Sequence, residues 1–152
     1  MLLKILSILL LLVLPLSGFS QTYHSSNSLF FLPQVGVEHF QGSPYRYQVS
    51  LRYVPADTTA KVSFQATQVG KNDYDFKKHD HTSEVVRPGE WHTYTIQGKI
   101  EPGVKKLWFY SILAGNGTFW FDNLTLQVQL PNETWENVPI KNGDFEGEGV
   151  LE

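Results

Sequence analysis

The segment Tyr45-Arg46-Tyr47-Gln48-Val49-Ser50-Leu51-Arg52-Tyr53 gives the clearest structural signal in this chain, because bulky apolar and polar side chains alternate throughout it. Successive side chains of a β-strand point to opposite faces of a sheet, so a period of two places every apolar residue here on one face. The tyrosines, the valine and the leucine predict a buried face, and the arginines, the glutamine and Ser50 predict a solvent-facing one. The segment therefore indicates a half-buried strand of an antiparallel sheet.

The same period recurs on both sides of this segment. Residues 61–67 and 92–97 also alternate, whereas residues 107–113 and 119–128 are rich in aromatic and aliphatic side chains, as in strands that are packed on both faces. Turn-forming sequences separate the strands, at Gly42-Ser43-Pro44, Pro55-Ala56-Asp57, Pro88-Gly89, Pro102-Gly103 and Gly115-Asn116-Gly117. No helical period with caps occurs after residue 20. The sequence predicts an all-β fold of six to eight strands, an antiparallel β-sandwich or jelly roll.

The first twenty residues are typical of a secretory signal peptide. Lys4 precedes an apolar run, Ile5 to Leu16, and Gly18-Phe19-Ser20 places small residues before a cut at Gln21. The run is shorter than the ~20 residues of a membrane-spanning helix, although a retained anchor is the alternative. Since no cysteine follows the run, lipid attachment of the bacterial lipoprotein type is excluded. We expect a secreted or periplasmic protein that has no membrane association after cleavage.

Composition limits the classes of function that remain. The chain has 12 basic and 15 acidic side chains and no basic stripe, so we expect no nucleic-acid partner. It has no cysteine, so a hydrophobic core must hold the fold, and a bacterial setting is favoured. We expect a flexible leader at 21–28, a β-sandwich at 29–130, and at 131–152 a linker and the start of a second domain. Asn142-Gly-Asp-Phe-Glu146 is typical of such a start.

Three motifs resemble galactose-binding-like jelly rolls of the carbohydrate-binding-module type. They are Gly117-Thr-Phe-Trp-Phe-Asp-Asn-Leu-Thr-Leu126, Glu90-Trp91-His-Thr-Tyr94 and Phe40-Gln-Gly42-Ser-Pro-Tyr45. The resemblance covers residues 40–146 and implies a module of a multidomain exported bacterial protein, such as one with a tail-specific serine peptidase domain. Two features depart from the family. The usual opening strand with a phenylalanine-glutamate pair is missing, and no catalytic domain is present from which a role could be carried over.

Sugar binding is the first candidate chemistry. Aromatic rings stack on the apolar C–H edges of sugars, and amide, carboxylate or guanidinium groups bind their hydroxyls. Trp91 and Trp120 lie in motifs that resemble structural strands, so we expect them in the core. Tyr74, in the long polar segment 69–84 that we interpret as a loop, is the first candidate for the platform. The other candidate ligand-binding residues are Trp108, Arg46, Gln48 and Gln65.

Metal binding is the second candidate. The resemblance implies a structural calcium, with Asp122 at a position where the family often places a ligand. Asp122 alone cannot form a metal site. In the alternative, it is a residue at a strand end or β-bulge whose carboxylate forms a hydrogen bond with the backbone. If the tail from Gly143 folds back as an edge strand, Glu146 approaches Asp122 and completes the pair. His79 and His81 are a weaker alternative, since residues two apart on a strand face the same way and could share a zinc ion.

Catalysis has no support in the sequence, because it contains no nucleophile elbow, phosphate-binding loop or zinc-protease helix. Two classes of function remain. In the main interpretation, the chain is a non-catalytic module that packs against a neighbouring catalytic domain of a longer protein, for which a peptidase is one candidate. In the alternative, it is a carbohydrate-binding module whose partner is an envelope or environmental glycan.

Overall fold

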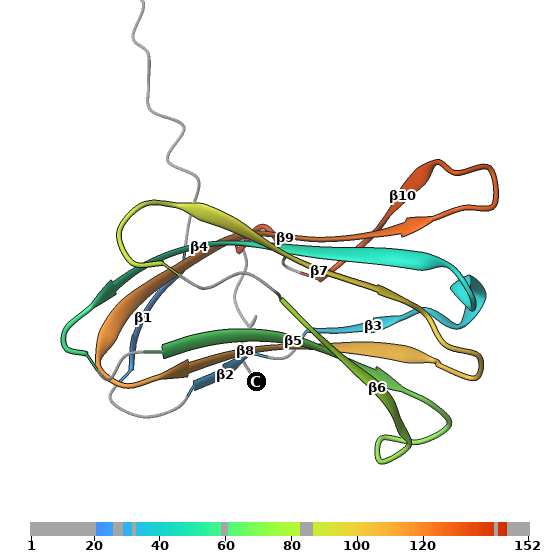
Figure 1. Ribbon diagram of the computed structural model, residues 1–152, viewed down its shortest axis with the longest axis horizontal. Helices are drawn as coiled ribbons and strands as arrows, with labels where there is room; N and C mark the ends of the chain where they lie inside the picture. The colour runs from blue at the N-terminus through green and yellow to red at the C-terminus, as the bar shows by residue number, and fades with distance from the viewer. Residues whose placement is uncertain are drawn as a thin grey trace, which may run out of the picture.

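The computed structural model describes residues 21–25, 29–31, 33–58, 61–82, 87–141 and 143–145. Within these ranges the chain forms two antiparallel sheets packed face to face, with one short 3-10 helix, η1 (Glu38–Phe40) (Figure 1). The predicted antiparallel β-sandwich is confirmed. The expected signal peptide, residues 1–20, lies outside the described residues. No helix within the described part of the chain is long and apolar enough to cross a membrane.

Sheet A is centred on two long strands that pair with each other. It contains, in spatial order, β1 (Gln21–Ser25), β9 (Gly117–Gln129), β4 (Pro44–Pro55) and β7 (His92–Lys99), and β10 (Trp135–Val138) also pairs with β9. Strand β1 pairs with the first part of β9 and β10 pairs with its last part, so the two short strands share one edge.

Sheet B has the same plan. Its spatial order is β2 (Leu29–Phe31), β8 (Lys106–Ala114), β5 (Lys61–Val69) and β6 (Phe76–His81), and β3 (Gln34–Gly36) pairs with β8. Strands β2 and β3 share the edge beside β8, whereas β6 forms the opposite edge and crosses below sheet A (Figure 1). Residues 76–81 therefore form a strand, and our interpretation of residues 69–84 as one long loop was wrong.

The core lies between the sheets and follows the predicted alternation. The apolar residues at alternate positions from Tyr45 to Tyr53 of β4 point inward, and each is at most 7% exposed. Tyr47 stacks on Phe109 of the opposite sheet with ring centroids 3.9 Å apart and planes 8° apart. Burial of such side chains, each worth about 1.5–3 kcal/mol, is the main stabilising contribution in a chain without disulfides.

Both ends of the described chain belong to this sandwich. Residues 21–25, expected within a flexible leader, form strand β1. Residues 135–138, expected in a linker, form β10. Beyond it, the Leu124 amide donates to the Gly143 carbonyl over 2.7 Å, and Phe145 is 2% exposed with its ring 6.1 Å from that of Phe121. The tail thus folds back onto the sandwich, in a turn rather than an edge strand, and the start of a second domain stays a prediction.

Candidate functional site

The outer face of sheet B gathers side chains from β5, β6 and β8. The register places Thr67 between His79 and Trp108, and Gln65 between His81 and Tyr110. Because paired residues share a face and the inward positions are occupied by the core, these side chains lie together on the outer face, where Thr67 is covered by its neighbours and only 1% exposed. We call this surface the sheet B face. Its residues are Gln34, Lys61, Ser63, Gln65, Thr67, Phe76, His79, His81, Lys106, Trp108, Tyr110 and Ile112.

Three aromatic rings lie next to one another on the sheet B face. The Trp108 ring centroid is 6.5 Å from that of Tyr110 and 6.0 Å from that of Phe76, whose ring meets it edge-on at 74°. Phe76 is exposed, and the other two are half-buried. Burial raises the pKa of the Tyr110 hydroxyl, which is therefore a neutral hydrogen-bonding group at ordinary pH. The three rings form an apolar surface with one polar end.

A hydrogen-bonded group of polar side chains lies beside these rings. The His79 Nδ1 is 2.9 Å from both the Gln65 Nε2 and the Thr67 Oγ1, and the Gln65 Nε2 also donates to the Thr67 Oγ1 over 3.0 Å. An amide nitrogen only donates, so this arrangement assigns Nδ1 of neutral His79 as the acceptor and leaves the proton on Nε2. His79 consequently offers a fixed N–H donor beside the aromatic rings.

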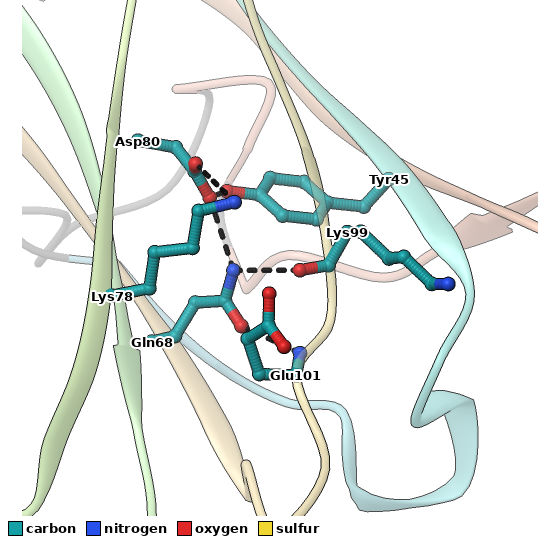
Figure 2. A network of polar contacts seen from close by, with 6 residues as sticks. All are labelled: Tyr45, Gln68, Lys78, Asp80, Lys99 and Glu101. Carbon is teal, nitrogen blue, oxygen red and sulfur yellow. Dashed lines mark hydrogen bonds and ion pairs between the residues drawn. The ribbon is translucent and has the colours of Figure 1, made fainter.

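The inward side of β6 is attached to the rest of the sandwich by a polar network (Figure 2). The Asp80 Oδ2 accepts hydrogen bonds from the Tyr45 hydroxyl at 2.6 Å and from the Gln68 Nε2 at 3.0 Å. Burial, together with the hydrogen bond to Asp80 and its charge, raises the pKa of Tyr45 far above its ordinary value. Tyr45 belongs to sheet A, so this bond joins the edge strand of sheet B to the opposite sheet.

Within the same network, both the nitrogen and the oxygen of the buried Gln68 side-chain amide have hydrogen-bond partners. Its Nε2 also donates to the Lys99 carbonyl at 2.8 Å, and its Oε1 accepts from the Glu101 amide at 2.8 Å (Figure 2). Lys78 adds an ion pair with the Asp80 Oδ1 at 3.0 Å. Since residues of a strand alternate between faces, holding Asp80 inward fixes His79 and His81 outward.

Tyr74, the first candidate from the sequence, lies at the tip of the loop between β5 and β6 and is 88% exposed. Its amide donates to the Asn72 Oδ1 at 3.1 Å, an Asx turn that shapes the tip. Asp73 attaches the loop to the sheet B face through an ion pair with Lys106 at 2.7 Å. Lys106 is two residues from Trp108 on the same side of β8, so the loop adjoins the Trp108 end of the face.

Two other candidates lie on the opposite surface of the molecule. The Arg46 guanidinium stands 4.4 Å above the Trp135 ring, and the Gln48 Nε2 donates to the Thr95 Oγ1 at 3.2 Å, both on the outer face of sheet A. Trp108 and Gln65 lie on the sheet B face. The structure therefore divides the five residues predicted from the sequence between two surfaces that point in opposite directions.

The expectation that Trp91 and Trp120 lie in the core was wrong. Trp91 is 44% exposed, and Trp120 is half-buried on the outer face of sheet A with the Arg52 guanidinium 5.2 Å from its ring centroid. Phe76 and His79 also lie beside the candidate sugar-binding residues, although neither was predicted from the sequence as part of a sugar site. The spacing of His79 and His81 was the available signal, because it fits a strand with one outward face.

Of the candidate metal ligands, the structure describes Asp122, His79 and His81. Asp122 lies at a β-bulge in the β4–β9 pairing, and its Oδ1 accepts from the Asn123 amide at 2.8 Å, which is the backbone-binding role considered above. Glu146 lies outside the described residues. Among the residues described, no three His, Asp or Glu side chains form a group that could hold a metal ion. Calcium at Asp122 and a metal at His79 and His81 stay predictions.

Comparisons with known proteins find similarity in solved structures alone. No protein-family model matches the chain, and a search of curated proteins finds no match. One similar structure contains the CBM22-1 and GH10 modules of Clostridium thermocellum xylanase 10B complexed with xylohexaose. The alignment has 16% identity, a TM-score of 0.45, and covers 68% of this chain but 20% of that one.

A second similar structure is the PbXyn10C CBM in its apo form. It has 17% identity and a TM-score of 0.49, and the alignment covers 90% of this chain and 80% of that chain. Both structures carry carbohydrate-binding modules in their names. Because both TM-scores are below 0.5, the function proposed below is based on the geometry of the sheet B face.

Proposed function

We propose that this chain is a non-catalytic carbohydrate-binding module whose ligand lies along the sheet B face. The observation that carries the proposal is the line of Phe76, Trp108 and Tyr110 beside the hydrogen-bonded group of Gln65, Thr67 and His79. Sugar rings present apolar C–H edges to aromatic side chains, and their hydroxyls need donors and acceptors in fixed positions. This surface offers both on strands of one rigid sheet.

The polar groups suit hydroxyl recognition because their orientations are fixed before a ligand arrives. The His79 Nε2–H faces outward while its Nδ1 is occupied by Gln65 and Thr67. The network behind Asp80 holds the strand that carries His79 (Figure 2). A preorganised site loses less conformational entropy on binding, so even a few hydrogen bonds contribute to affinity.

This geometry favours the carbohydrate-binding alternative over the main interpretation from the sequence. A surface that packs against a catalytic domain would be expected to expose a broad apolar patch. The sheet B face instead mixes three aromatic rings with amide, hydroxyl and imidazole groups. A sugar-binding module also fits an exported protein, which the expected signal peptide at residues 1–20 predicts.

Binding to a panel of soluble polysaccharides, measured by affinity electrophoresis or calorimetry, tests the proposal. Trp108→Ala is expected to weaken binding by about 2 kcal/mol, or roughly 30-fold, as for a central aromatic contact. Trp135→Ala is the matched control, because Trp135 is a half-exposed indole on the opposite sheet. Equal loss in the two variants, or no binding to any polysaccharide, would reject the proposal.

A further inference from the structure

Several outward positions on the described strands of sheet B carry a lysine or a histidine, and none of these described positions carries a carboxylate. Lys61 and Lys106 lie on β5 and β8, and His79 and His81 lie on β6. Among the described strands of this sheet, no Asp or Glu occupies an outward position. The whole chain has a formal net charge of −3, whereas the charged side chains at the outward strand positions of this face are Lys61 and Lys106, the second of which is paired with Asp73.

The acidic groups of the adjoining loop and of β6 each have a basic or polar partner. Asp73 pairs with Lys106 of the face itself, and Asp75, in the loop, pairs with Lys77 of β6 at 2.9 Å. Asp80 points to the inner side of β6, where Tyr45 and Gln68 hold it. These contacts leave the centre of the sheet B face, around His79 and His81, without an opposing carboxylate from the described residues.

We infer that the sheet B face selects acidic glycans, whose uronate carboxylates meet this basic surface while their rings stack on Trp108 and Tyr110. The inference rests on the proposed function and specifies its ligand class. Aromatic stacking requires a sugar ring, and charge complementarity requires an anionic one. A neutral glycan would keep the ring stacking and the hydrogen bonds to its hydroxyls but would lack the charge attraction.

The histidines make this selection depend on pH. Histidine is the side chain that changes charge between about pH 5 and 8. The groups that face His79 from β5 are the uncharged Gln65 and Thr67, and both can accept a hydrogen bond from a protonated Nδ1 after the hydroxyl and the amide rotate.

The described residues of β8 and β7 that lie near His79 and His81 place no carboxylate beside these two side chains. Across the sheet, β8 contributes Tyr110, Trp108 and Lys106. Strand β7, which packs against the other side of β6, contributes the Lys99 carbonyl to the Gln68 network. Protonation of His79 and His81 would therefore add positive charge to a face that carries Lys61 and Lys106, and we expect binding of a polyuronate to become tighter as the pH falls.

The test compares one polyuronate with the same polymer after its carboxylates have been reduced to hydroxymethyl groups. Calorimetry at low salt should give tighter binding to the polyuronate, with the ratio between the two polymers rising about two- to tenfold from pH 7.5 to pH 5.5 and falling with added salt. Equal affinity for the two polymers at both pH values would overturn the inference and leave the proposed function intact. Binding to neither polymer would overturn the inference, and the proposed function would fall with it if no polysaccharide of the wider panel bound either.

Two further arms separate a glycan site from a charged surface. The variant His79→Gln/His81→Gln retains hydrogen-bonding groups and should lose the pH dependence, whereas His92→Gln, on β7 of the other sheet, should keep it. Polyglutamate should bind weakly because it has no sugar ring for Trp108 to stack on. Polyglutamate binding as tight as that of the polyuronate, or an unchanged pH dependence in the double variant, would overturn the inference.

Discussion

Replacing Tyr45 with phenylalanine tests the network that holds β6 in place. The substitution removes one hydroxyl and keeps a ring that is 1% exposed, so the packing of the core is retained. It deletes the 2.6 Å hydrogen bond to the Asp80 Oδ2 and leaves this carboxylate with Gln68 and Lys78. The strand that presents His79 and His81 then loses its direct side-chain link to sheet A.

The expected loss of stability follows from the charge of the acceptor. A hydrogen bond to a charged group contributes about 1.5–3 kcal/mol, and Asp80 is only 10% exposed, so solvent replaces little of it. We expect Tyr45→Phe to reduce the free energy of unfolding by about 2 kcal/mol. In a domain of this size, that corresponds to a melting temperature roughly 8 °C lower.

Tyr47→Phe is the matched control, because the residue lies on the same strand and the same face. The Tyr47 hydroxyl is buried and has no hydrogen-bond partner in the described structure. Burial alone raises its pKa far above the ordinary value. Removal of an unsatisfied buried hydroxyl leaves nothing unpaired, so Tyr47→Phe should leave stability unchanged within about 0.5 kcal/mol or increase it.

Urea denaturation followed by tryptophan fluorescence measures the change in unfolding free energy of both variants. The comparison requires that the slope of this free energy against urea concentration is the same in the wild type and the variants. A second variant, Asp80→Asn, combined with Tyr45→Phe in a double-mutant cycle, isolates the coupling between the two side chains. The reasoning would be refuted if Tyr47→Phe were as destabilising as Tyr45→Phe, or if the cycle gave no coupling.

Three further predictions follow from single contacts. Gly98→Ala should cost about 1–3 kcal/mol in unfolding experiments, because a Cβ would lie 2.7 Å from a buried ring carbon, whereas Gly36→Ala, with nothing within 4 Å, should be neutral; equal effects would contradict this. Phe145→Ala should cost about 3–5 kcal/mol if the tail belongs to this core, and a change below about 1 kcal/mol would argue against it. The hydrogen bond from Lys77, followed by that from the Lys71 amide, lowers the pKa of Asp75 below its ordinary 3.8. The loop contacts of Asp75 are therefore complete above that pH and lost as the pH falls through the lower value, so the Lys71 amide resonance should titrate with a midpoint below 3.8, and a higher midpoint would disprove this.

The sandwich could be predicted from the sequence because its strongest signal is local. Alternation in β4 identifies the inward and outward residues of one strand without knowledge of its neighbours, and the structure agrees at every position from Tyr45 to Tyr53. The edges were harder to predict. Strand β6 reads as a polar loop because its inward residue, Asp80, is charged, and its burial depends on Tyr45, 35 residues earlier in the sequence.

The site was predicted only in part for the same reason. Trp108 and Gln65 were recognised as candidates by residue type, but their position on the same face depends on the pairing of β5 with β8. Arg46 and Gln48 have equally suitable chemistry and lie on the other sheet, which no local pattern reveals. Trp120 resembles a core residue by its motif, yet its place on β9 points it outward to Arg52.

The central claim is that glycan binds on the sheet B face, and the four tryptophans of the chain allow a direct measurement. Each indole N–H gives its own NMR resonance, which single Trp→Phe variants assign. During titration with an oligosaccharide that binds, the Trp108 resonance should shift in a saturable manner, and those of Trp120 and Trp135 on the outer face of sheet A should not move. Saturable shifts at Trp120 or Trp135 with an unchanged Trp108 resonance would contradict the account.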